Sequence, residues 1–121
     1  MSQQLNHLNL SVQNVADNVE FFQTYFGFRI VAGQGRSLTV LTNDDGFVLT
    51  LMVDRSLGEL AYPAMFHLGF LQSVRANVDA IHQKMIDAGT DAPQPANMRR
   101  NTYGFYVRAP GGFLIEVSSY E

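Results

Sequence analysis

Hydrophobic and polar residues alternate at the start of the chain, which predicts a strand over residues 5–12 with one buried face. Its apolar face carries Leu8, Leu10 and Val12, and its polar face carries His7, Asn9 and Ser11. A helical spacing of apolar residues follows, with Asp17 expected to cap the helix and Glu20 to close a capping box. Gly27 can supply the left-handed residue that ends this helix.

Three further strands are predicted in the first half of the chain, over residues 28–32, 37–42 and 46–53. Glycines around position 34 separate the first two, and a turn at residues 43–46 separates the last two. The stretch 57–64 then has the composition of a linker.

The second half of the chain follows the same plan. A strand is predicted over residues 65–72, and then a helix capped by Ser73 or Asn77 that turns apolar residues inward. These inward residues are Val78, Ile81 and Met85. Strands are expected at about 97–108 and 112–119, so that each half is a βαβββ module of about 55 residues.

Short sequence repeats relate the two halves. His-Leu-Asn-Leu at residues 7–10 matches His-Leu-Gly-Phe at 67–70, and a Gly-Phe strand closes each half, beginning at Gly46 and at Gly112. A module this small is only marginally stable alone. We therefore predict one α+β domain over residues 1–121, in which modules of about 1–58 and 63–121 form a curved mixed sheet with the helices outside.

The strand alternation places four polar side chains on the face away from the helices, because residues i and i+2 share a face. They are His7, Thr50, His67 and Glu116. Two imidazoles and a carboxylate suit a divalent iron, manganese, nickel or zinc ion. A carboxylate inside a concave sheet is also costly unless it is paired or bound to a cation. His7, His67 and Glu116 are therefore the predicted metal ligands.

A purely structural role is the alternative for each of these side chains. A single inward histidine is usually a hydrogen-bonded structural residue, and Glu116 could instead pair with an arginine. The candidate partners are Arg99, Arg100 and Arg108. The equivalent positions of His7 and His67 in the repeat favour the metal hypothesis. His82, the third histidine, has no repeat partner and is expected at the surface.

Composition and charge exclude several classes of function. The chain has 121 residues, of which 46% are hydrophobic and 16% charged, as is usual for a globular protein. Its net charge of −3 and scattered basic residues argue against nucleic-acid and membrane partners. The absence of cysteine excludes disulfides, thiolate catalysis and iron–sulfur clusters. With no signal peptide and no long apolar run, a cytoplasmic location is expected.

Taken together, these motifs resemble the vicinal oxygen chelate superfamily, which includes glyoxalase I, bleomycin-resistance proteins, fosfomycin-resistance thiol transferases and extradiol dioxygenases. The resemblance rests on His7, the aromatic helix end at residues 21–28, His67, and the stretch 109–116. That last stretch is similar to the family's Asp-Pro-Asp-Gly turn and ligand strand, although Ala and Gly replace both aspartates. The resemblance implies paired βαβββ modules and commonly a homodimer, sometimes with sites shared between chains.

Departures from the family patterns narrow the activity that the resemblance implies. Glyoxalase I members carry a catalytic carboxylate at the position of Thr50, so typical glyoxalase I chemistry is not expected. The fosfomycin enzymes and extradiol dioxygenases have a tyrosine ten residues before the glutamate, which Tyr106 matches. The basic residue with which the fosfomycin enzymes bind the phosphonate has no counterpart after Glu116. The additional active-site histidines of the extradiol dioxygenases have no good candidates in this chain either.

These observations predict a metal-dependent enzyme that acts on a small oxygen-bearing substrate by Lewis-acid chemistry. Tyr106 is the candidate catalytic residue, with simple packing of its ring as the alternative. The candidate substrate-binding residues are Asn9, Thr50, Met52 and Arg108, with Ser11, Leu71, Leu114 and Ser118 also in the pocket by strand phase, and Arg99 and Arg100 available for an anionic substrate. The rival hypotheses are a metal-free protein that sequesters an antibiotic or metabolite, and a purely structural module.

Overall fold

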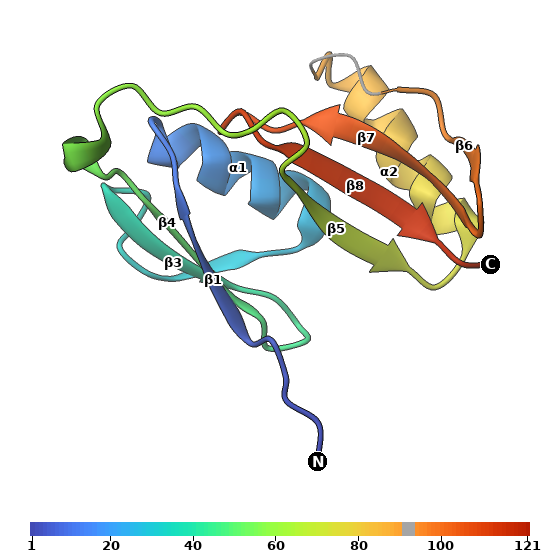
Figure 1. The fold of residues 1–121 in the computed structure, drawn as a ribbon, viewed down its shortest axis with the longest axis horizontal. Coiled ribbons are helices and arrows are strands. Elements are labelled where there is room, and N and C mark those ends of the chain that lie inside the picture. The colour runs from blue at the N-terminus through green and yellow to red at the C-terminus, as the bar shows by residue number, and fades with distance from the viewer. Residues whose placement is uncertain (91–93) are drawn as a thin grey trace. The chain divides into compact units, whose positions relative to one another are not determined.

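The computed structural model describes residues 1–90 and 94–121, and the chain divides into two compact units, residues 1–60 and 61–121 (Figure 1). In unit 1 the elements are β1 (His7–Ser11), α1 (Val15–Phe26), β2 (Arg29–Ala32), β3 (Leu38–Thr42) and β4 (Val48–Met52), followed by a short 3₁₀ turn, η1 (Arg55–Leu57). The sheet order is β1-β4-β3-β2, with β1 parallel to β4 and the other pairs antiparallel.

Unit 2 has the same topology. Its elements are β5 (His67–Gln72), α2 (Arg75–Asp87), β6 (Asn97–Arg99), β7 (Thr102–Arg108) and β8 (Leu114–Ser119). The sheet order is β5-β8-β7-β6, with β5 parallel to β8. The predicted α+β fold of two βαβββ modules is confirmed, with one mixed four-stranded sheet in each unit.

Each helix covers one face of its own sheet, and the predicted alternation decides which residues are buried there. In unit 1 the fully buried residues include Leu10, Phe22, Leu41, Leu49 and Leu51. In unit 2 they include Val78, Met85, Phe105, Phe113 and Ile115. Ile81, predicted to point inward, is only half-buried. Neither helix in the described residues is long and apolar enough to cross a membrane.

The predicted helix caps were wrong, although Gly27 ends α1 as expected, with a φ of 69°. Asn14 caps α1 by accepting a hydrogen bond from the Asp17 backbone N–H at 3.0 Å. Asp17 therefore lies in the first turn, where its negative charge suits the helix dipole. Helix α2 is preceded by Val74, with no side-chain cap, so neither Ser73 nor Asn77 caps it.

The stretch 97–108 divides into two strands, β6 and β7, which form a hairpin. Arg100 occupies the turn with a φ of 52°, in the left-handed region that glycine and asparagine favour. An arginine carries no sequence signal for such a turn, which explains why the position of the break within this stretch was not predicted.

Strands β7 and β8 approach each other unusually closely at Gly104. A Cβ atom at this position would overlap the carbonyl oxygen of Val117 and would lie 2.9 Å from Cα of Ser118. Only glycine fits this contact without a backbone shift. Two residues further along β7, Tyr106 pairs in register with Glu116 on β8.

Candidate functional site

His67 and Glu116 lie together on neighbouring strands of unit 2. His67 begins β5, and Glu116 lies on the parallel strand β8, opposite Gly69. His67 Nε2 is 3.9 Å from Glu116 Oε1, and their side chains are 39% and 25% exposed. Both side chains are therefore accessible enough to reach a ligand, as the strand phase predicted for this pair.

A backbone contact orients the His67 ring. Its Nδ1 lies 2.9 Å from the carbonyl oxygen of Met65. A carbonyl can only accept a hydrogen bond, so Nδ1–H is the donor. Nε2 is then the ring nitrogen that lies near the Glu116 carboxylate, 3.9 Å from Oε1. Metal-binding histidines are commonly oriented by such a contact through the other ring nitrogen.

Tyr106 adjoins the histidine–glutamate pair. Its ring lies 5.6 Å from the His67 ring in an edge-on arrangement, with an angle of 85° between the planes. Burial, and next the charge and hydrogen bonding of Glu116, raise the pKa of the Tyr106 phenol, while the nearby charge of Arg99 acts in the opposite direction. The phenol is thus held in its protonated form, which can donate a hydrogen bond.

A pocket of about 430 Å³ opens beside Tyr106 within unit 2. It is lined by Met65, Gln94, Arg99, Tyr106, Val107, Arg108 and Leu114. Arg108 and Leu114 were predicted pocket residues, and Arg99 was a predicted anion contact. Met65 and Gln94 were missed, because they lie outside the strands and strand phase does not apply to them.

The arginines near the pair do not neutralise Glu116. In the described part of the chain, the ionisable side chain that lies against the Glu116 carboxylate is that of His67, at 3.9 Å. Arg99 instead donates to the Gln94 side chain at 2.8 Å, and Arg108 donates to the Gly112 carbonyl oxygen at 2.7 Å. The alternative that an arginine is the partner of Glu116 is therefore not supported.

His82, expected at the surface, is a partly exposed residue of α2 that also makes internal contacts. Its side chain is half-buried, and its ring meets the Phe105 ring edge-on at 4.9 Å. Nε2 of His82 lies 3.0 Å from the Gln94 carbonyl oxygen, and therefore donates a hydrogen bond to it. The Gln94 backbone N–H donates in turn to the Tyr106 carbonyl oxygen at 3.1 Å. His82 thus helps to hold a pocket residue in place.

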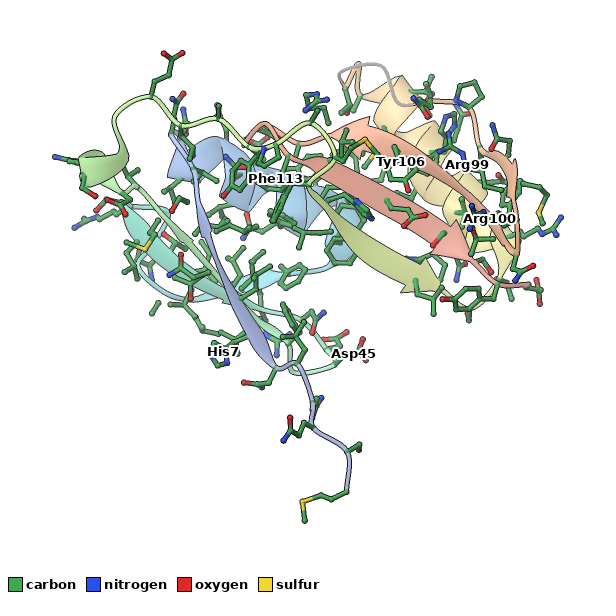
Figure 2. All side chains as sticks on the ribbon, in the orientation of Figure 1. His7, Asp45, Arg99, Arg100, Tyr106 and Phe113 are labelled. Carbon is green, nitrogen blue, oxygen red and sulfur yellow. The ribbon has the colours of Figure 1, made fainter. Side chains whose placement is uncertain are left out.

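The other predicted site residues belong to unit 1. His7 is exposed on β1, and its Nδ1 lies 3.0 Å from Oδ1 of Asn6 (Figure 2). Asn9 pairs in register with Thr50 on β4, and its side-chain amide donates to Met52 Sδ at 3.2 Å. In the described residues no three His, Asp or Glu side chains gather as metal ligands do. The structure thus brings together His67 and Glu116 of the predicted set, while His7 lies in unit 1.

Comparison with known proteins identifies the family. The model of the Glyoxalase/Bleomycin resistance protein/Dioxygenase superfamily matches residues 4–117, nearly the whole chain. The chain belongs to this superfamily. The vicinal oxygen chelate resemblance inferred from the sequence motifs is thereby confirmed.

Proteins similar to this chain include a possible glyoxalase from Bacillus cereus. That protein is 40% identical in sequence to this chain, and its structure matches with a TM-score of 0.84. The match covers 96% of this chain and 98% of that one. The uncharacterized protein PA2024 of Pseudomonas aeruginosa is 28% identical over 98% of this chain and 89% of its own length. The lactoylglutathione lyase of Agrobacterium tumefaciens has the same fold, with 16% identity, a TM-score of 0.79 and coverage of 98% and 94% of the two chains.

Proposed function

We propose that this superfamily member is a metal-dependent enzyme acting on a small oxygen-bearing substrate, with His7, His67 and Glu116 as metal ligands. The observation that carries the proposal is the oriented His67–Glu116 pair. Two ligands that each lie about 2.0–2.2 Å from one ion can be at most about 4.4 Å apart. The separation of 3.9 Å between His67 Nε2 and Glu116 Oε1 is within this limit.

His7 is proposed as the third ligand because it holds the position equivalent to His67 in the repeated module. It comes either from the same chain or from a second copy in a homodimer. In either case both units contribute to one functional domain. Manganese, iron(II), zinc and nickel all accept two imidazoles and one carboxylate.

When bound, such an ion acts as a Lewis acid that holds a substrate oxygen and stabilises developing negative charge. Tyr106 lies both on the pocket wall and against His67, so its hydroxyl can donate a hydrogen bond or a proton to a substrate there. Arg108 is proposed to contact the substrate from the same pocket. Asn9, Thr50 and Met52 lie next to one another on the unit 1 sheet. They are the proposed substrate contacts from that unit.

Thermal unfolding of metal-free protein tests the proposal. A metal at 100 times its dissociation constant stabilises the folded state by about 2.7 kcal/mol. For a chain of this size that free energy raises the Tm by roughly 8–10 °C. We expect this rise with manganese, zinc, nickel or anaerobic iron(II), and we expect the His67→Ala variant to lose it.

An unchanged Tm with all four metals would contradict the enzyme proposal. Binding of small molecules by such a metal-insensitive protein would instead support sequestration, in the manner of the bleomycin-resistance proteins.

A further inference from the structure

We propose that the pocket of unit 2 binds a small organic anion, whose acidic group is held between Arg99 and Arg108. The inference rests on the proposed function, because it assigns the substrate class of that same site. It concerns the pocket beside Tyr106, and not the metal ligands themselves.

The pocket is positively charged in a protein that carries a net charge of −3. Two guanidinium groups line it, and no carboxylate lines it among the residues that the structure describes. In the described part of the chain neither Arg99 nor Arg108 forms a salt bridge. Two unneutralised guanidinium groups in one concave site attract an anion, and their planar donor edges match the oxygens of a carboxylate or phosphoryl group.

Arg99 is held in place by neutral partners. Its Nη2 donates to Gln94 Oε1 at 2.8 Å, and its Nε donates to Asn97 Oδ1 at 3.3 Å. Its guanidinium carbon lies 5.0 Å from the centre of the Tyr106 ring (Figure 2). These contacts fix the orientation of the guanidinium without cancelling its charge. Pre-organisation of this kind lowers the entropy cost of binding.

Both arginines keep hydrogen-bonding capacity for a ligand. A guanidinium group has five N–H donors. The side-chain bonds described for Arg99 use two of them, and the bond from Arg108 Nη1 to the Gly112 carbonyl oxygen uses one. The remaining donors are available to the oxygens of an acidic group.

The rest of the pocket wall favours a ligand with an apolar body. Met65 and Leu114 contribute apolar surface, and the volume of about 430 Å³ lies in the range of small-molecule sites. Tyr106 joins this pocket to His67. A ligand anchored at the arginines therefore has its body next to Tyr106, close to the proposed metal ligands.

Isothermal titration of metal-free protein tests the inference, with three probes that share a phenyl ring: benzoate, phenylphosphonate and the neutral benzamide. The protein is stripped with a chelator and dialysed, and ionic strength is held constant because screening changes such affinities. We expect at least one of the two anions to bind about tenfold more tightly than benzamide, as charge-assisted hydrogen bonds predict. The tighter anion identifies the acidic group as a carboxylate or a phosphoryl group.

Three variants localise the binding. Arg99→Gln and Arg108→Gln are each expected to weaken the preferred anion about tenfold. Arg100 was the other arginine expected to hold an anion, but it is exposed and is not among the residues that line the pocket. Arg100→Gln is therefore the matched control, and it should leave the affinity unchanged. The inference would be overturned if benzamide bound as tightly as the anions, or if none of the probes bound. It would also be overturned if Arg100→Gln lost as much affinity as the other two variants. Because the protein is metal-free, this result is independent of the metal test.

Discussion

Substitution of Glu116 by glutamine is expected to reduce the affinity for a divalent metal at least about 100-fold. Changes to residues that only orient a ligand already cost 10–100-fold in affinity, and this change replaces an anionic ligand with a neutral amide of the same size. Glu116 is partly exposed on β8, so the substitution leaves the core intact. The measurement is a competition titration against a metal-responsive fluorescent chelator.

Glu20→Gln is the matched control for this experiment, since it makes the same chemical change on an exposed position of α1. It should bind metal like the unmodified protein. If Glu116→Gln also kept the original affinity, Glu116 would not be a ligand, and its ion pair with His67 would be purely structural.

The second large effect is expected on stability. Phe113→Ala should lower the free energy of unfolding by about 3–5 kcal/mol, because the ring is fully buried and its removal leaves a cavity. The ring also meets Tyr62 edge-on at 5.3 Å, a contact that the alanine loses. This is a large share of the roughly 5–15 kcal/mol that stabilises a typical domain.

Urea denaturation followed by circular dichroism measures this loss. Tyr120→Ala serves as the control, because Tyr120 is an aromatic residue of the same unit with 72% of its surface exposed. Its substitution should change stability by less than about 0.5 kcal/mol. A similarly small effect for Phe113→Ala would show that the core of unit 2 does not depend on this ring.

Much of the fold follows from local periodicity that the sequence displays directly. Leu10, Leu49 and Leu51 are buried on alternating positions of their strands, as the strand phase requires. Strand alternation also puts His67 and Glu116 on one face of neighbouring strands, and their side chains lie 3.9 Å apart on that face. These predictions succeeded because each depends on a short segment and on one repeated pattern.

The features that were missed depend on backbone geometry or on contacts between distant segments. Val74 precedes α2 without a capping side chain, and Arg100 occupies a left-handed turn position, so neither shows the usual residue types. The hydrogen bond from His82 to Gln94 joins α2 to the segment before β6. No pattern in the chain marks such a contact, and the pocket built around Gln94 was therefore only partly predicted.

The proposed metal site is tested most directly by elemental analysis of protein purified without a metal-binding tag, beside the His67→Ala variant. His82→Gln is the control for removing a histidine elsewhere. We predict near-stoichiometric manganese, iron, zinc or nickel in the unmodified protein and in His82→Gln, and loss of this metal from His67→Ala. Protein that contains no metal, or a His67→Ala variant that retains the full amount, would contradict this prediction.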